Sequence, residues 1–152
     1  MTCEQIREFQ DLLKDYLSDS SVKKMQEYKA HGRVSVYAHS LNVAAMAYKI
    51  NEKTGRKCDL KTLLIGALLH DFYLYDWHDA RLFVNIFKMH GFTHPDIACQ
   101  NAVDHFDIDE NVQKVIRCHM WPLTFRRFPS SREAMIVCMA DKLSALKETF
   151  TR

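Results

Sequence analysis

Apolar residues recur three or four positions apart along most of the chain, which is the spacing of an amphipathic helix. No segment alternates apolar and polar residues as a half-buried β-strand does. Ser130 and Glu133 have the spacing of a capping box, which indicates the start of a last helix. We therefore expect an all-α bundle of about seven helices, over residues 4–17, 34–54, 60–70, 80–90, 96–106, 110–120 and 131–146, with a weaker helix over 22–30.

The segment from Leu63 to Asp76 departs from this pattern, because an almost unbroken apolar run leads directly into His70 and Asp71. A helix that is apolar on nearly all sides belongs at the centre of a bundle, with Asp59 as its N-cap and Gly66 allowing a neighbour to approach closely. An imidazole and a carboxylate at the end of a buried segment need hydrogen bonds, an ion pair or a metal. The rest of the chain should supply those partners.

Gly91 and Pro95 are expected to separate two helices in the second half of the chain. Gly91 suits the position just after a helix, and Pro95 suits the first turn of the next one. This arrangement places His94 at the N-terminus of the second helix. Residues 80–106 are therefore predicted to form two helices with a break between them.

The composition fits one domain built mainly from helices. At 152 residues and 47% hydrophobic, the chain can bury a sizeable core and leaves no room for a second domain of ordinary size. Four glycines and three prolines are too few for the many turns of a sandwich or a barrel. We expect a single domain over residues 1–152.

Charge and hydropathy argue against several kinds of partner. The net charge is +2 with both signs interspersed, so no basic surface for a nucleic-acid backbone is expected. No apolar run approaches the roughly 18 residues of a membrane span, and residues 1–9 carry charges where a signal peptide is apolar. The five cysteines form no Cys-x-x-Cys pair. We expect reduced thiols and a cytoplasmic protein that binds neither nucleic acid nor membrane.

Six histidines and aspartates fall at inward-facing positions or at helix ends: His39, His70, Asp71, His94, His119 and Asp141. By itself, a histidine on a core face is more often a satisfied structural residue than a ligand. Imidazoles and carboxylates are also good ligands for divalent transition metals, and these six come from five predicted helices. If these side chains converge on metal ions, coordination gives each buried polar group a partner that it would otherwise lack.

These residues resemble the signature of the HD-domain superfamily of metal-dependent phosphohydrolases. That signature is a histidine, then His-Asp, then a distant aspartate, and it is matched here by His39, His70-Asp71 and Asp141. The flanking residues also match, with His-Ser-Leu-Asn-Val-Ala, Ala-Leu-Leu-His-Asp and Ala-Asp-Lys-Leu. The resemblance covers about residues 33–146 and implies an HD-type helical domain, with helices from residues 1–30 packed on it.

His94 and His119 occupy the places of two extra ligands in dinuclear HD proteins, such as the bacterial HD-type diadenosine-tetraphosphate hydrolases. The resemblance implies two divalent transition-metal ions with Asp71 as the bridge between them. His94 and His119 bind one ion, and the other is bound by His39, His70, Asp71 and Asp141. Residues 120–123, Met-Trp-Pro-Leu, do not match the Gly-Tyr-Pro motif of HD proteins that degrade cyclic dinucleotides.

A dinuclear site of this kind hydrolyses phosphate esters or anhydrides without a protein nucleophile, because a water that bridges two ions is acidified to hydroxide. Asp71 positions that hydroxide as the bridging ligand. The expected substrate is a small anionic phosphate compound, most simply a nucleotide. Iron or manganese suits such a mixed nitrogen and oxygen site better than magnesium, and nickel, cobalt, zinc and magnesium are the alternatives.

Several residues near the ligands in sequence are candidates for substrate binding. Arg126, Arg127 and Lys142 can bind phosphate, although each is equally well explained as a solvated surface charge. Tyr75 and Trp121 can stack on a nucleobase, or can form the rim of the core.

Two other functions remain open at this stage. A few HD-superfamily members use a di-iron site with this ligand pattern to activate oxygen and cleave a small organophosphonate or polyol. A metal-bound signalling module without turnover is the third possibility. The sequence does not fix the oligomeric state.

Overall fold

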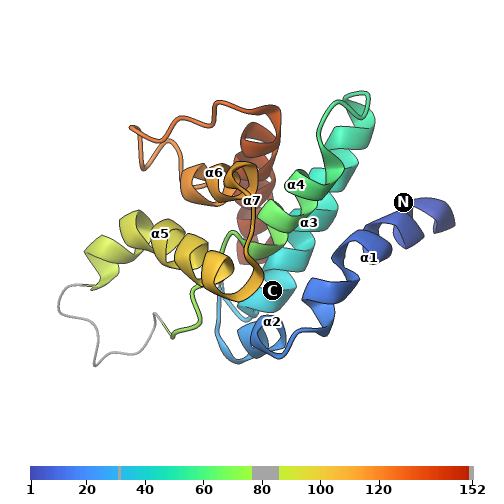
Figure 1. Ribbon diagram of the computed structural model, residues 1–152. Coiled ribbons are helices and arrows are strands. Elements are labelled where there is room, and N and C mark those ends of the chain that lie inside the picture. The colour runs from blue at the N-terminus through green and yellow to red at the C-terminus, as the bar shows by residue number, and fades with distance from the viewer. Residues whose placement is uncertain (31, 77–85, 151–152) are drawn as a thin grey trace.

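The computed structural model describes residues 1–30, 32–76 and 86–150, and within these ranges the fold is all-α, as the sequence predicts (Figure 1). A single bridge, between Lys29 and Ser35, is the one β-type pairing in the described residues. None of the helices in these ranges is long and apolar enough to cross a membrane. In chain order the elements are α1 (Cys3–Ser18), α2 (Ser20–Lys24), the 3-10 turn η1 (Met25–Glu27), α3 (Val36–Lys53), α4 (Leu60–Leu69), α5 (Ile86–Phe106), α6 (Glu110–Cys118) and α7 (Arg132–Phe150).

Helix α4 lies at the centre of the molecule. Every residue from Thr62 to Leu69 is buried, and the helix contacts α1, α3, α5, α6 and α7. In Figure 1 it passes between α3 and α6. The Asp59 carboxylate caps it by accepting a hydrogen bond from the Thr62 N–H at 2.7 Å. This position brings the C-terminal end of α4, with His70 and Asp71, inside the bundle.

Gly66 allows α6 to pack closely against α4, as expected from the sequence. A Cβ atom added at Gly66 would lie 2.6 Å from Cγ1 of Val115 on α6. Real Cβ atoms essentially never come that close to a neighbour, and the Val115 side chain is fully buried. The distance between the two helices therefore depends on a glycine at this position.

Helix α1 packs against α4 and is tied to α3. Leu13 is fully buried, and the ring of Phe9 meets Tyr48 edge to face at a centroid distance of 6.1 Å. The Tyr48 hydroxyl donates a hydrogen bond to the Glu8 carboxylate at 2.5 Å. These contacts anchor the N-terminal helix on the helices that carry the polar cluster.

The predicted break between two helices around residues 91–95 is wrong. Residues 86–106 form one continuous helix, α5, which has Pro95 inside it; the predicted start at residue 80 lies outside the described residues. Proline lacks the N–H that would bond to the carbonyl of Gly91, yet the helix continues through this missing hydrogen bond. Gly91 is helical and packs near Leu123, where an added Cβ would lie 3.0 Å from Leu123 Cδ2. His94 is therefore held inside a helix and not at its N-terminus.

The predicted capping box at the start of α7 is also wrong in its details. The residue that caps α7 is Ser131, whose hydroxyl accepts a hydrogen bond from the Ala134 N–H at 3.1 Å. Glu133 instead accepts a hydrogen bond from the backbone N–H of Asp59 at 2.9 Å. A long-range contact has replaced the local one, so Glu133 joins the start of α7 to the start of α4.

The five cysteines are free, as their spacing indicates. Cys99, Cys118 and Cys138 are buried, and burial raises the pKa of the Cys118 thiol to about 11. Cys118 is next to His119 in sequence but stays protonated at neutral pH, which makes it a poor nucleophile.

Candidate metal centre

Six buried histidine and aspartate side chains from five helices converge at the C-terminal end of α4. All are at most 8% exposed. His70 is the C-cap residue of α4 with Asp71 directly after it, and His119 is the C-cap residue of α6. The other three come from within helices, His39 from α3, His94 from α5 and Asp141 from α7. The structure thus brings together all six candidate ligands.

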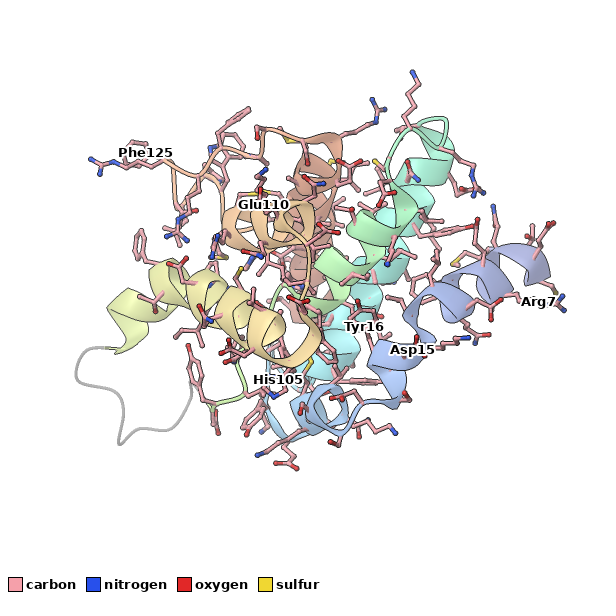
Figure 2. All side chains as sticks on the ribbon, viewed as in Figure 1. Arg7, Asp15, Tyr16, His105, Glu110 and Phe125 are labelled. Carbon is pink, nitrogen blue, oxygen red and sulfur yellow. The ribbon has the colours of Figure 1, made fainter. Side chains whose placement is uncertain are left out.

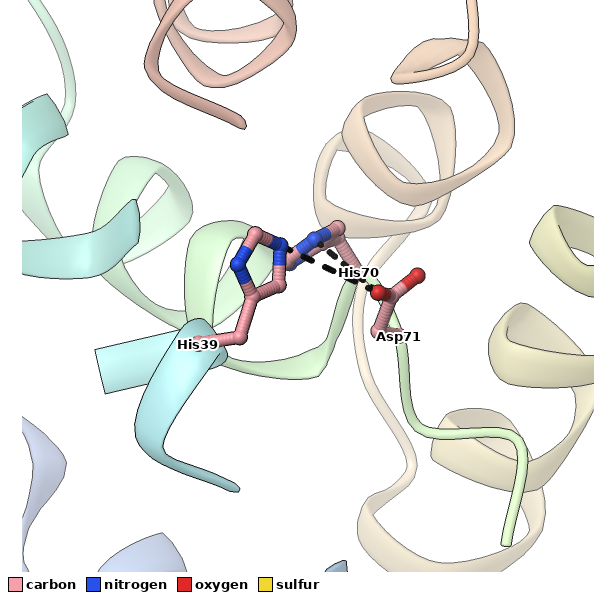
Figure 3. A group of neighbouring side chains, drawn as sticks. All are labelled: His39, His70 and Asp71. Carbon is pink, nitrogen blue, oxygen red and sulfur yellow. Dashed lines mark ion pairs between the residues drawn. The ribbon is translucent and has the colours of Figure 1, made fainter. Parts of the chain in front are cut away.

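One carboxylate oxygen of Asp71 faces the rings of His39 and His70, as Figure 3 shows. Asp71 Oδ2 lies 4.0 Å from His39 Nε2 and 3.5 Å from His70 Nε2. Asp141 completes this group, with its Oδ1 at 3.1 Å from His39 Nε2 and 3.7 Å from His70 Nε2. Atoms bound at about 2.1 Å to one ion lie roughly 3 to 4 Å from each other. The spacing in this group agrees with that range.

The other carboxylate oxygen of Asp71 faces a different pair of rings. Asp71 Oδ1 lies 3.3 Å from His94 Nε2 and 3.6 Å from His119 Nε2. The two ring nitrogens are only 2.8 Å apart. Two nitrogens that approach so closely need a hydrogen or a cation between them. Asp71 therefore stands between two groups of imidazoles and presents one oxygen to each.

Hydrogen bonds on the outer side of three rings fix their orientation. His70 Nδ1 lies 2.8 Å from the Ala67 carbonyl oxygen, and His119 Nδ1 lies 2.7 Å from that of Ile116. His39 Nδ1 lies 2.8 Å from Oε2 of Glu148. An Nδ1–H donated to an outer acceptor leaves Nε2 free to bind a metal, which is the usual arrangement of metal-ligating histidines.

Two buried atoms of the cluster have no hydrogen-bond partner, namely His70 Nε2 and Asp71 Oδ1. Such atoms are costly inside a protein unless they are satisfied in another way. The cluster contains three overlapping groups of His and Asp atoms that can hold a metal ion. Imidazole and carboxylate are both good ligands for divalent transition metals, so the residues fit such a group.

A scan against protein-family models matches the HD domain over residues 36–146. The chain belongs to the HD-domain family. The matched range includes all six residues of the cluster. HD domains commonly bind divalent metals and act as metal-dependent hydrolases. A search of the curated proteins found no match, and a search of the solved structures found none either.

The electrostatics of this HD domain keep its carboxylates ionised and His119 neutral. Burial works against ionisation of Asp71, but the rings of His70 and His94 outweigh it and hold the pKa of Asp71 well below its usual range. Burial, together with the neighbouring rings of His94 and His70, lowers the pKa of His119 to about 3. Carboxylate and neutral imidazole are the forms that bind metals.

His39 has the opposite shift. Burial lowers its pKa, but the hydrogen bonds to Asp141 and Glu148 outweigh this effect and raise the pKa to about 10. The ring shares a proton with one carboxylate on each side. A metal ion at Nε2 has to displace the proton that faces Asp141, while the Nδ1–H facing Glu148 can stay.

The sequence interpretation missed Glu148. Its side chain is 7% exposed, and its second oxygen accepts a hydrogen bond from Asn42 Nδ2 at 2.8 Å. Glu148 follows Asp141 by seven residues on α7, which puts both on the same face of the helix, two turns apart. That spacing was a signal that could have identified it as a partner of the cluster.

The HD-domain cluster opens into a cavity of about 600 Å³. Asp71, His94, His119 and Asp141 line it, and because each is at most 8% exposed we refer to them as its inner end. Tyr73 and Lys142 also line it, and the other described residues of the wall are apolar: Ala30, Gly91, Met120, Pro122, Leu123 and Ala145. A volume of this size is in the usual range for small-molecule sites.

Of the residues predicted to bind substrate, only Lys142 lines this cavity. The Arg127 guanidinium forms two hydrogen bonds with Asp96, at 2.8 and 2.7 Å. Arg126 lies over the ring of Phe125, which Figure 2 shows at the outer tip of the loop between α6 and α7. Tyr75 packs on Tyr73 and Trp121 on Phe128, with ring centroids 4.9 and 5.5 Å apart.

Proposed function

We propose that this HD domain is a metal-dependent phosphohydrolase that holds two divalent transition-metal ions, with Asp71 as the bridging ligand. The observation that carries the proposal is the position of the Asp71 carboxylate. Its Oδ2 faces His39 and His70, while its Oδ1 faces His94 and His119. A single ion would not need a carboxylate with an imidazole pair at each oxygen.

In this proposal the two ions have different ligand sets. The first is bound by His39, His70, Asp141 and Oδ2 of Asp71. The second is bound by His94, His119 and Oδ1 of Asp71, a set that leaves positions for water and substrate. Iron and manganese are the ions we favour, because the set mixes imidazole with carboxylate.

Two such ions, when bound, acidify a water between them and hold phosphoryl oxygens for in-line attack on phosphorus. The protein fixes the geometry for this chemistry. Asp71 sets the separation of the two groups, and Glu148 and the carbonyls of Ala67 and Ile116 orient the imidazoles. The cavity beside the ligands, of about 600 Å³, gives room for a small substrate. The proposed substrates are small phosphate esters or anhydrides, including nucleotides.

The experiment that tests the activity is a panel of nucleotides and phosphomonoesters, assayed separately with manganese, iron, nickel and magnesium. Phosphate release is expected with at least one transition metal. In Asp71→Ala it is expected to fall to the level measured without protein. Release that persists in Asp71→Ala would overturn the proposed site. Oxygen uptake with iron and an organophosphonate or polyol, without phosphate release, would instead identify an HD-type oxygenase. A metal-loaded protein that turns over neither class would point to a signalling module.

The metal count tests the dinuclear part separately. Elemental analysis of protein prepared without chelator is expected to find close to two transition-metal ions per chain. His94→Ala and His119→Ala are each expected to lose one of them. His105→Ala is the matched control, because His105 is an exposed histidine on α5 that lies outside the cluster. One ion or none in the parent protein, unchanged in both variants, would contradict the dinuclear site.

A further inference from the structure

The walls of the cavity beside the metal centre differ sharply in chemistry from its inner end. Beyond the ligands, the described residues of the wall are mainly apolar, namely Ala30, Gly91, Met120, Pro122, Leu123 and Ala145. Leu123 is 48% exposed, and its Cδ2 lies next to Gly91, so these two residues bring the loop after α6 against α5 at the cavity wall. A ligand with its phosphate at the inner end would meet apolar side chains along the rest of its length.

The one lysine or arginine among the described residues that line the cavity is already engaged. Lys142 Nζ lies 2.9 Å from the carbonyl oxygen of His119, and 3.2 Å from both the carbonyl oxygen and the Sγ of Cys138. An ammonium group has three hydrogens to donate, and these three acceptors use them. Lys142 thus ties the end of α6 to α7 and has no further donor for a second phosphate group.

We infer that, given the phosphohydrolase activity proposed above, the substrate is a phosphate monoester of a compact apolar alcohol. Its single phosphoryl group faces the metal ligands, and its aliphatic or aromatic group packs on Leu123, Met120 and Ala145. In the reaction the oxygen of water bonds to phosphorus and the bond between phosphorus and the ester oxygen breaks. The alcohol leaves with one proton of the water, and inorganic phosphate keeps the other. A polyphosphate chain would place its additional charges against the apolar wall.

Binding of alkylphosphonates tests this inference without requiring turnover, because water does not cleave their phosphorus–carbon bond. Calorimetry on the full chain loaded with manganese would compare methyl-, propyl- and pentylphosphonate. Each added methylene that is buried is expected to tighten the Kd by about fourfold. A phosphonate as long as pentylphosphonate but ending in a carboxylate is expected to bind at least about tenfold more weakly than pentylphosphonate, since its charge would lie against the apolar side chains of the described wall, where the Lys142 ammonium is already engaged.

Two variants locate the effect in the cavity wall. Leu123→Asn is expected to reduce the increase in affinity that each added methylene gives. Ala145→Leu is expected to shorten the cavity, so that pentylphosphonate no longer binds more tightly than propylphosphonate. Leu146→Asn is the matched control, because Leu146 is also an exposed leucine, at 57%, but does not line the cavity. Since the Leu123 side chain is half exposed, its substitution leaves the core unchanged.

The results separate this inference from the proposed function. A Kd that does not change with chain length, no binding of any phosphonate, or equal binding of the carboxylate-ended compound would overturn the inference, even if esters are hydrolysed. If the Kd falls as the alkyl chain lengthens but the protein hydrolyses no ester, the inference that the ligand is apolar is supported and the proposed phosphohydrolase activity is overturned.

Discussion

At the scale of single residues, function depends on side chains that are buried although they are polar. His39 is fully buried between two carboxylates, and Asp71 is 8% exposed among four imidazoles. Each of these groups would be destabilising by itself, because a buried charge without a partner costs several kcal/mol. Together they form one connected cluster, in which His39, His70 and His119 each also have a hydrogen-bond partner on the outer side.

Glu148 is the outer partner whose removal is most informative. Glu148→Ala is expected to weaken binding of the ion held by His39 by about 10- to 100-fold, since the ring loses the acceptor that fixes its orientation. Glu148→Gln retains an acceptor oxygen and is expected to have a smaller effect. Metal affinity would be measured by competition with a chelator. The control is Glu110→Gln, because the Glu110 side chain is 86% exposed and its carboxylate pairs with Lys114 on the same helix and not with a ligand of the cluster. Parent-like affinity in Glu148→Ala would contradict this role.

At the scale of helices, the ligand geometry depends on how closely α4 and α6 pack. His70 ends α4 and His119 ends α6, and their ring centroids are 4.9 Å apart. Gly66 in the middle of α4 sets the approach of α6 through its contact with Val115. A change in the packing of these helices therefore changes the distance between ligands that belong to different ions in the proposed site.

Gly66→Ala tests this coupling. The added Cβ would meet the buried Val115 Cγ1 at 2.6 Å, so overpacking is expected to lower the free energy of unfolding by about 1–3 kcal/mol, although alanine has the better helix propensity. Urea unfolding measures the change, and adding Val115→Ala is expected to restore most of the loss. Gly91→Ala is the matched control, because the neighbours found for its Cβ are the ends of the flexible Leu123 and Met120 side chains. Equal stability of Gly66→Ala and the parent would refute the tight contact.

At the scale of the whole molecule, the cluster joins five helices that are far apart in sequence. The first ligand, His39, and the last, Asp141, are separated by 102 positions, and Glu148 extends the span to 109. A metal ion bound by such a set stabilises the folded chain, because the unfolded chain cannot present the ligands together. Metal content and global stability should therefore change together.

Metal removal tests that link. A chelator is expected to lower the Tm of the parent protein, and manganese or iron added back is expected to restore it. At a free ion concentration 100 times its Kd, one ion contributes about 2.7 kcal/mol. Asp71→Ala is expected to show little response to either treatment. A Tm that is the same with and without chelator in the parent would rule out a metal that supports the fold.

Much of this protein could be predicted from local sequence. The helical spacing of apolar residues predicted the all-α fold, and the apolar run up to His70 and Asp71 predicted α4 at the centre. The six candidate ligands also stood out, because they fell on apolar helix faces or at predicted helix ends and matched the residue pattern of HD-domain proteins. The break at Gly91 and Pro95 and the capping box at Ser130 were wrong, since contacts with distant residues overrode the local signals there.

What only the tertiary structure decided depends on atoms from different helices. The two oxygens of Asp71 face separate imidazole pairs, Glu148 binds the outer side of His39, and Lys142 is engaged with the end of α6. Spacing along one helix can place Glu148 on the same face as Asp141, but it does not give the contacts themselves, because each is set by how the helices pack around α4. The sequence by itself determined the all-α class, the central position of α4 and which side chains can bind metal. Packing around α4 decided how those side chains face each other and what kind of cavity lies beside them.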